Sequence, residues 1–119
     1  MKKIKEDLLP SLRYHVRYPL VSATVLTLKG EASVYTVQTF KDIVLSLVDS
    51  NPRTLVVDFG QVRFIDGSTL LVLQKVCKRL KPRLVLVCRT EGHSGMFELA
   101  GFDRKSIFRT RKEALSKSH

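Results

Sequence analysis

The sequence has few of the residues from which catalytic and metal sites are built. Its two cysteines, Cys77 and Cys88, lack metal-ligand spacing and fall within apolar patterns. This predicts buried free thiols in a reducing compartment. The three histidines show no nucleophile or metal spacing. The segment 92–95 is too short for a phosphate loop and lacks its lysine. We therefore predict that the protein is not an enzyme and that it binds no metal or cofactor.

Long apolar runs are also absent. The longest, Leu84 to Cys88, is the size of a strand, whereas a membrane span needs roughly 20 residues. The first residues, Met1 to Asp7, start basic but then meet acids and Pro10 in place of a long apolar region, so we expect no signal peptide. A length of 119 residues suits one domain with a real core. These features predict a cytoplasmic protein with no integral membrane segment.

Acidic residues are scarce relative to basic ones. The 11 Asp and Glu stand against 21 Lys and Arg, which gives a formal net charge of +10. Residues 61–119 carry 13 of the basic and 5 of the acidic residues. This bias favours an acidic partner, which leaves nucleic acid or an anionic membrane as one alternative. Most aromatic residues fall in apolar patterns and so do not offer stacking surfaces. We therefore predict no specific nucleic-acid partner.

Hydrophobic periodicity predicts that strands and helices alternate along the chain. The first strand, starting at Leu12, alternates apolar and polar residues as an edge strand does, and Pro19 should interrupt its pairing. Helix starts are marked by Ser33, by Asp66 or Ser68, and by Thr110. The expected strands cover residues 12–18, 20–28, 54–59, 83–88 and 107–108, and the expected helices cover 35–50, about 67–80, 94–100 and a final stretch after Thr110.

This order of elements predicts the architecture. A helix, a short turn and a buried strand in succession imply crossover connections and parallel pairing. The fold class is therefore α/β: one domain over residues 12–119, with a mixed four- to five-stranded sheet covered by about four helices. Residues 1–11 have no clear period and are expected to form a flexible lead-in.

The most informative stretch runs from Leu55 to Leu73. A buried strand ending in Asp58 and a link over residues 60–65 lead to Asp66-Gly67-Ser68-Thr69, which opens a helix. Small polar residues are what any helix N-cap prefers, so a purely structural cap is the simplest explanation. A hydroxyl held at this point would also face outward and be easily modified.

This stretch resembles the signature of the STAS domain, the fold shared by anti-sigma-factor antagonists and the cytoplasmic tails of sulphate transporters. Segments 29–31, 98–103 and 110–115 extend the resemblance over residues 12–116. In the bacterial antagonists, a serine at the helix start is phosphorylated by a partner kinase that also acts as an anti-sigma factor. Matched from Asp66, that serine is Ser68, with Thr69 as second choice. Gly67 and Thr69 depart from the family's Asp-Ser-Ser/Thr-Gly pattern.

The resemblance implies a bacterial, non-enzymatic domain that regulates transcription by binding an anti-sigma factor/serine kinase or another regulatory protein. The basic net charge predicts that this partner has an acidic face. A homodimer is left open. A phosphate on Ser68 would add about −1.5 to −2 charges. The helix N-terminus would attract this phosphate and Asp66 would repel it, with free energies of similar size. The fold should therefore tolerate the phosphate, whereas a partner interface from which water is excluded should not. The expected docking residues are Asp66, Gly67, Ser68, Thr69, Gln74 and Lys75.

Within the same family, a second function stays open. The chain could be a STAS subunit of a lipid or anion transport system, or a member of a stress-sensing scaffold. The sequence does not separate these functions from a sigma-factor switch.

Overall fold

A computed structural model describes residues 10–20, 23–50, 52–80 and 83–117 of the chain. Five strands form one sheet in the order β1 (Leu12–Leu20), β2 (Ala23–Ala32), β3 (Thr54–Ile65), β4 (Leu84–Val87) and β5 (Ile107–Phe108). β1 and β2 pair antiparallel, and all later pairs are parallel. The helices are α1 (Val37–Asp49), α2 (Gly67–Leu80), α3 (Glu91–Leu99) and α4 (Arg111–Lys117), with a short 3₁₀ helix at Arg104–Ser106. The predicted α/β fold with a mixed sheet is confirmed.

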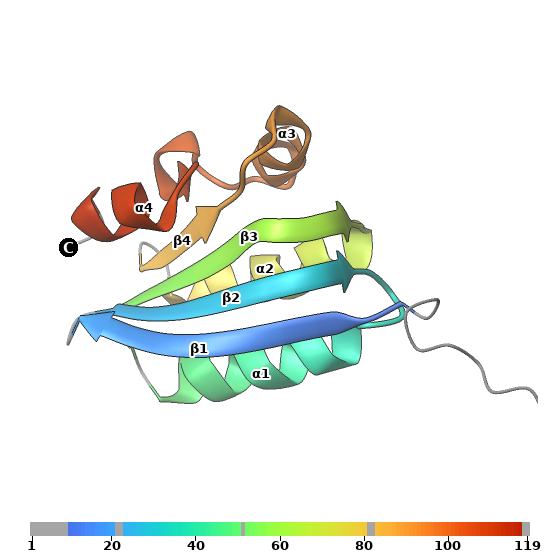
Figure 1. The fold of residues 1–119 in the computed structure, drawn as a ribbon, viewed down its shortest axis with the longest axis horizontal. Coiled ribbons are helices and arrows are strands. Elements are labelled where there is room, and N and C mark those ends of the chain that lie inside the picture. The colour runs from blue at the N-terminus through green and yellow to red at the C-terminus, as the bar shows by residue number, and fades with distance from the viewer. Residues whose placement is uncertain (1–9, 21–22, 51, 81–82, 118–119) are drawn as a thin grey trace, which may run out of the picture.

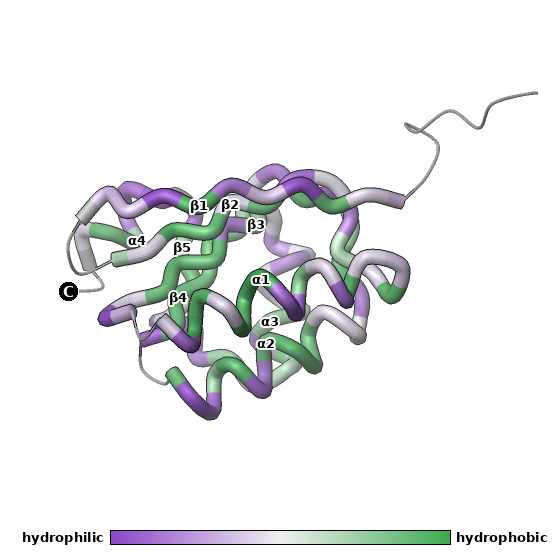
Figure 2. The backbone as a smooth tube through the Cα atoms, turned by 90° about the horizontal axis from the view of Figure 1, so that it is seen from below, coloured by the Kyte–Doolittle hydropathy of each residue, from purple (hydrophilic) through white to green (hydrophobic). Residues whose placement is uncertain are grey.

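The helices cover the two faces of the sheet unequally. α1, α2 and α3 lie on one side, and α4 lies on the other (Figures 1 and 2). The larger core fills the space between the sheet and α1–α3. α4 closes a smaller cluster, in which Ala114 meets valines of β2, β3 and β4. Within the described ranges, no helix is long and apolar enough to cross a membrane.

Three strands extend past their expected ends. β1 continues through Pro19 to Leu20, which was expected to begin the second strand. β3 does not end at Phe59 but continues to Ile65, so the expected link over residues 60–65 is part of the sheet. β2 likewise continues past residue 28, where its end was expected, to Ala32. The β2–β3 register shifts on either side of Lys29 and Gly30. Such bulges let the two strands stay paired through a bend, and they carry β3 directly to the start of α2.

Several helix boundaries also differ from the expected ones. α1 begins at Val37, because the Thr36 hydroxyl donates to the Glu31 carbonyl and holds the preceding residues in a turn. α3 begins at Glu91, three residues earlier than expected, with Thr90 as its N-cap. After its end Gly101 has φ +98°, the left-handed conformation with which helices commonly end. The predicted cap of α4 is also confirmed, since the Glu113 amide donates to the Thr110 hydroxyl at 3.1 Å.

β1 is an edge strand, as predicted. Leu12 and Val16 pack against the larger core, and the β1–β2 register shifts next to Pro19. Of the expected flexible lead-in, only Pro10 and Ser11 belong to the described residues. The Ser11 carbonyl accepts a hydrogen bond from the Glu31 amide at 2.8 Å, so this end of the lead-in is tied to β2.

Gly30 and Gly67 differ in backbone conformation and in the space around them, so alanine at the two positions should have different effects on stability. Gly30 has φ +114°, and a Cβ there would overlap the Ser11 carbonyl oxygen. We expect Gly30→Ala to lower the free energy of unfolding by about 2 kcal/mol, the typical cost of a strained backbone. Gly67 has no heavy atom within 4 Å of the place a Cβ would occupy. Gly67→Ala should therefore leave stability unchanged or raise it by up to about 1 kcal/mol. Chemical denaturation measures both, and equal losses would contradict this assignment.

Both cysteines are free thiols among the described residues, as predicted. Cys88 is 2% exposed, and burial raises the pKa of its thiol to about 11, whereas Cys77 is partly exposed. We expect iodoacetamide at mildly alkaline pH to modify Cys77 first, with Cys88 reacting only as the protein unfolds. Mass spectrometry of a time course measures the order. Prior modification of Cys88 would show that this end of β4 opens readily.

Candidate functional site

The start of α2 is fixed by a single carboxylate. Asp66 lies between β3 and α2, and its backbone amide donates to the Ala32 carbonyl at 3.1 Å. Its side chain accepts from the Val34 amide at 2.9 Å through Oδ2 and from the Ser68 amide at 3.0 Å through Oδ1. Of the two capping residues that the sequence left open, Asp66 is the N-cap. It ties the start of α2 to the loop that follows β2.

Ser68 is bound to the same carboxylate. Its hydroxyl donates to Asp66 Oδ1 at 2.5 Å, and its side chain is partly exposed. Burial alone would raise the pKa of Asp66. The Ser68 hydroxyl and the amides of Val34, Ser68 and Thr69 outweigh burial and hold this pKa below its ordinary value of 3.8. Asp66 is therefore ionised at neutral pH and orients the Ser68 hydroxyl at the helix start.

Thr69 and Gly67 occupy very different environments. The Thr69 side chain is fully buried, and its hydroxyl has no hydrogen-bond partner among the described residues. Thr69 is thus out of reach of a kinase or a docked protein in this conformation, which corrects the expectation that it is a second acceptor and a docking residue. Gly67 is exposed in open space, so this departure from the family pattern leaves room around Ser68.

Exposed apolar side chains adjoin this corner. Val34 and Tyr35, in the loop that Asp66 holds, are 61% and 80% exposed. Leu71 of α2 is 61% exposed. The sequence analysis did not identify these three residues, because their proximity depends on the tertiary fold. We call Val34, Tyr35, Ser68 and Leu71 the α2 corner surface.

The two remaining predicted docking residues differ in role. Lys75 is exposed and lies seven residues after Ser68, on the same helix face as Ser68 and Leu71. Gln74 is partly buried, and its amide donates to the Ala100 carbonyl at 2.8 Å. Gln74 therefore joins α2 to the end of α3, and only Lys75 is placed to extend the α2 corner surface.

The Asp66 cap gives a stability prediction with a pH dependence. We expect Asp66→Ala to lower the free energy of unfolding by about 2 kcal/mol, since a cap and the Val34 hydrogen bond are both lost. Asp66→Asn should cost less, because its one carbonyl oxygen keeps part of the cap. The pKa of Asp66 is lower in the folded state than in the unfolded state. The carboxylate therefore stabilises the fold above its unfolded pKa, and this stabilisation is lost as the pH falls through the folded pKa.

Denaturation at several pH values tests this dependence. The difference in free energy of unfolding between wild type and Asp66→Asn should become smaller below about pH 4. A difference that is the same at every pH would contradict the stabilising role of the Asp66 carboxylate.

The corner contains no metal-binding constellation. Within the described ranges, no three His, Cys, Asp or Glu side chains are grouped so that they could hold a metal ion. The arrangement consists of a capped helix start, an oriented hydroxyl and a partly apolar surface. These are features of a surface that binds or is modified.

Known structures share this fold at low sequence identity. An anti-sigma factor antagonist from Mycobacterium paratuberculosis superimposes with a TM-score of 0.82 and 22% identity over 91% of this chain and 94% of that one. The phosphorylated form of the Bacillus cell fate determinant SpoIIAA has a TM-score of 0.69 and 17% identity, over 90% of this chain and 100% of that one. The murine anion transporter Slc26a9 has a TM-score of 0.67 and 15% identity, over 92% of this chain but 22% of that one.

The comparison with protein families shows to which family the chain belongs, whereas the likeness to these solved structures shows only the fold. A search of the curated proteins found no match. The STAS domain, in contrast, matches residues 16–114, a range that runs from β1 into α4 and includes the whole Asp66 corner. Since this match covers most of the sequence, the chain belongs to the STAS domain family.

Proposed function

We propose that the protein is a regulatory, non-enzymatic interaction domain, an anti-sigma-factor antagonist that binds an anti-sigma factor with serine-kinase activity through the α2 corner surface. Phosphorylation of Ser68 ends this binding. The observation that carries the proposal is the Ser68 hydroxyl, which is partly exposed at the start of α2 and oriented by Asp66 at 2.5 Å. Support comes from the fold shared with an anti-sigma factor antagonist and with SpoIIAA, which has a phosphorylated form.

The electrostatics of the corner favour a switch that acts on binding. The amides of Ser68 and Thr69 already donate to the Asp66 carboxylate, so a phosphate on Ser68 would not find these donors free. It would replace the hydroxyl donor and lie beside an ionised carboxylate, which repels it. The Val34–Asp66 hydrogen bond does not involve Ser68, so the corner keeps a second tie. The phosphate thus changes the charge of the surface more than it changes the fold.

The chemistry of the surface also indicates the kind of partner. Leu71, Tyr35 and Val34 offer apolar contact area, and Lys75 and Lys78 add positive charge along α2. A partner with an apolar patch edged by acidic residues would complement both features. A dianion at Ser68 would then be desolvated at this interface and would meet carboxylates of the same sign, which penalises the complex twice.

The direct test is incubation with candidate anti-sigma factor kinases and ATP, followed by mass analysis of peptides that contain Ser68 and Thr69. We expect one phosphate on Ser68 and none on the buried Thr69. Ser68→Ala should accept no phosphate and should still form the complex. A protein that forms no complex and takes up no phosphate with any candidate would overturn the proposal.

The fold shared with Slc26a9 supports a second candidate function, a STAS subunit of an anion or lipid transport system; a stress-sensing scaffold stays open beside it. In either case, the protein would bind a transport or scaffold protein and would need no phosphate on Ser68. Co-purification from cells with crosslinking, compared between wild type and Leu71→Asp, separates these functions. Recovery of a transporter component with wild type alone would favour the transport function over the sigma-factor switch.

A further inference from the structure

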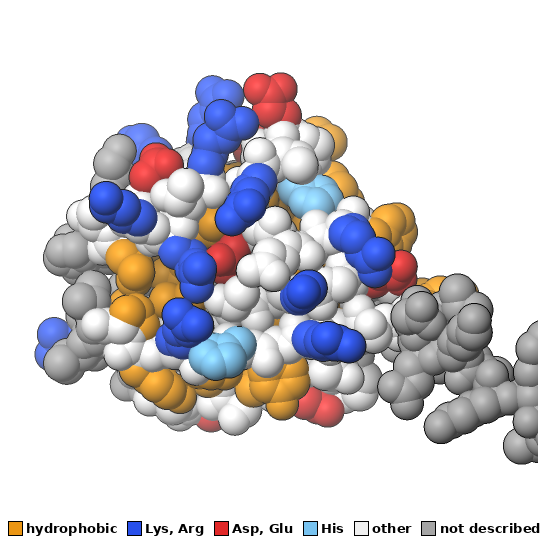
Figure 3. All heavy atoms as spheres, in the orientation of Figure 1, with side chains coloured by type: hydrophobic (Ala, Val, Ile, Leu, Met, Phe, Trp, Pro, Cys, Tyr) orange, Lys and Arg blue, Asp and Glu red, His pale blue; other side chains and the backbone are white. Residues whose placement is uncertain are grey.

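A large part of one sheet face has no covering helix. α4 packs against β3, β4 and β5 on this face and also covers Val25 near the start of β2, which leaves β1, the rest of β2 and the far part of β3 open. Because Leu12 and Val16 turn toward the larger core, Arg13, His15 and Arg17 of the same strand turn toward the open face. Figure 3 looks onto this face and shows Lys and Arg side chains spread across it. We call it the open sheet face.

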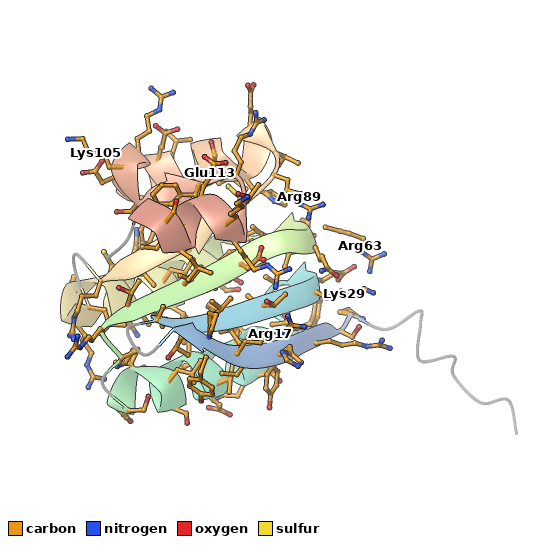
Figure 4. The ribbon with its side chains drawn as sticks, turned by 60° about the vertical axis from the view of Figure 1, so that its left-hand side comes forward. Arg17, Lys29, Arg63, Arg89, Lys105 and Glu113 are labelled. Carbon is orange, nitrogen blue, oxygen red and sulfur yellow. The ribbon has the colours of Figure 1, made fainter. Side chains whose placement is uncertain are left out.

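The open sheet face contains two hollows that share one residue. The first has a volume of about 300 Å³ and is lined by the basic side chains of Arg13, His15, Arg17, Lys29 and Arg111, with no carboxylate in its lining. The second has a volume of about 280 Å³, and Arg111 lines it together with Arg89, Arg109 and Lys112. In Figure 4, Lys29, Arg63 and Arg89 project from the same end of the sheet. A nearly continuous basic track therefore runs from β1 to α4.

The positive charge of this track is largely uncompensated. The one carboxylate in the second hollow, Asp58, is 7% exposed and pairs with Arg111 at 3.2 Å. It also accepts the Gly60 amide at 2.7 Å. In the part of the chain that the structure describes, Arg13, Arg17 and Lys29 form no ion pair with a carboxylate. These charges are available to a polyanion.

Aromatic side chains accompany the basic ones along the edge of the sheet. Tyr14 and Tyr18 of β1 are 50% and 69% exposed, and Tyr14 also lines the first hollow. This corrects the expectation that exposed aromatic residues are lacking. Arg13 and Tyr14 are followed along β1 by Arg17 and Tyr18, with His15 and Val16 between the two pairs. Neighbouring residues of a strand point to opposite sides of the sheet, so the arginines lie on the open sheet face and the tyrosines on the side of Leu12 and Val16. The outer edge of β1 is free because β1 is the last strand of the sheet, so a ligand that lies across this edge meets both kinds of side chain.

We propose that the open sheet face and the β1 edge bind single-stranded nucleic acid without sequence preference. A strand rises about 3.4 Å per residue, so Arg13 and Arg17, four residues apart, are separated by about 14 Å and contact separate phosphates, and Lys29 contacts a third across the hollow. Tyr14 and Tyr18 provide faces on which bases stack, which any base can do. Arg13, Arg17 and Lys29 lie on the opposite side of the sheet from α2, and no residue of this site belongs to the α2 corner surface, so the site is separate from the Ser68 corner.

An anionic membrane is the weaker alternative for this face. Firm attachment to a bilayer surface requires apolar side chains that enter it. Apart from Tyr14, the lining of the first hollow is polar or charged. The exposed Val34 and Leu71 lie at the α2 corner surface instead. Arginines on one side of the free β1 edge and tyrosines on the other fit nucleic acid, with its separate phosphates and bases, better than lipid.

Fluorescence anisotropy with a labelled oligothymidine of about 20 nucleotides, in salt up to about 150 mM, tests the proposal on the full chain. We expect Arg13→Ser with Arg17→Ser to weaken binding about tenfold and to lower the slope of log K against log salt by about 1.4. Tyr14→Ser with Tyr18→Ser should weaken binding at least about fivefold, with the slope unchanged. The matched control is Lys75→Ser with Lys78→Ser, which removes the same charge from α2 and should change affinity less than about twofold. Arg17→Ser alone serves if a double variant does not fold.

Three results would overturn the proposal. The first is an equal loss in the Lys75 and Lys78 control, which would show that only net charge matters. The second is binding to duplex DNA as tight as to the single strand, since paired bases cannot stack on the tyrosines. The third is phosphatidylglycerol vesicles that bind more tightly than the oligonucleotide and lose affinity in the same arginine variants, which would assign the face to a membrane.

Discussion

Leu71→Asp is expected to weaken the complex with the partner kinase about 100-fold, because it places a charge at the centre of a desolvated contact. Leu71 is 61% exposed on α2 and lies three residues after Ser68, on the same helix face. Surface substitutions of this kind change stability by about 0.5 kcal/mol or less. Calorimetric titration of the partner, together with thermal melting, separates the two effects.

A matched control is available on another element. Leu99, near the end of α3, is 92% exposed and is not part of the α2 corner surface. Leu99→Asp introduces the same charge and should leave affinity within about twofold of wild type. If both variants lost affinity equally, a general effect of net charge would replace the specific contact at α2.

Phe59→Ala is expected to lower the free energy of unfolding by about 3–5 kcal/mol, the usual cost of removing a buried aromatic side chain. Phe59 is fully buried, and its ring centroid lies 6.1 Å from that of Phe40 and 5.2 Å from that of Phe97. It therefore joins α1 and α3 through the middle of β3. A domain of this size is typically stable by only about 5–15 kcal/mol, so this loss would bring it close to unfolding.

Phe64→Ala is the corresponding control on the same strand. Phe64 is 51% exposed, so we expect a loss of about 1 kcal/mol or less in the same denaturation experiment. Similar losses for Phe59 and Phe64 would contradict the position of the core that is described above.

Most of the fold could be predicted because its helices and strands follow local patterns. The apolar stripe of α1 and the continuous apolar run of β3 over residues 54–59 are each visible in the sequence. The strand extensions were not, since the bulges beside Lys29 and Gly30 depend on the partner strand. Residues 61–64 alternate polar and apolar side chains, but Phe64 and Ile65 are both apolar. So short a pattern did not distinguish a strand from a link, because the register shift that extends the pairing is not visible in the sequence.

The candidate site was predicted only in part, for a similar reason. Asp66, Gly67 and Ser68 are neighbours in sequence, and their cap could be recognised from residue type. The Val34 amide that holds Asp66 is 32 positions away, and the burial of Thr69 depends on the sheet behind α2. Most aromatic residues were expected to lie in apolar patterns, yet Tyr14 and Tyr18 are exposed, because the edge strand leaves the side of Leu12 and Val16 partly open.

The central claim is that a phosphate on Ser68 controls binding at the α2 corner surface. The most direct measurement is calorimetric titration of the partner kinase against the unmodified protein and against protein phosphorylated on Ser68, with the melting temperature of each. We predict at least about 100-fold weaker binding of the phosphorylated protein, with a fold that remains intact. Equal affinity of the two forms would contradict the account.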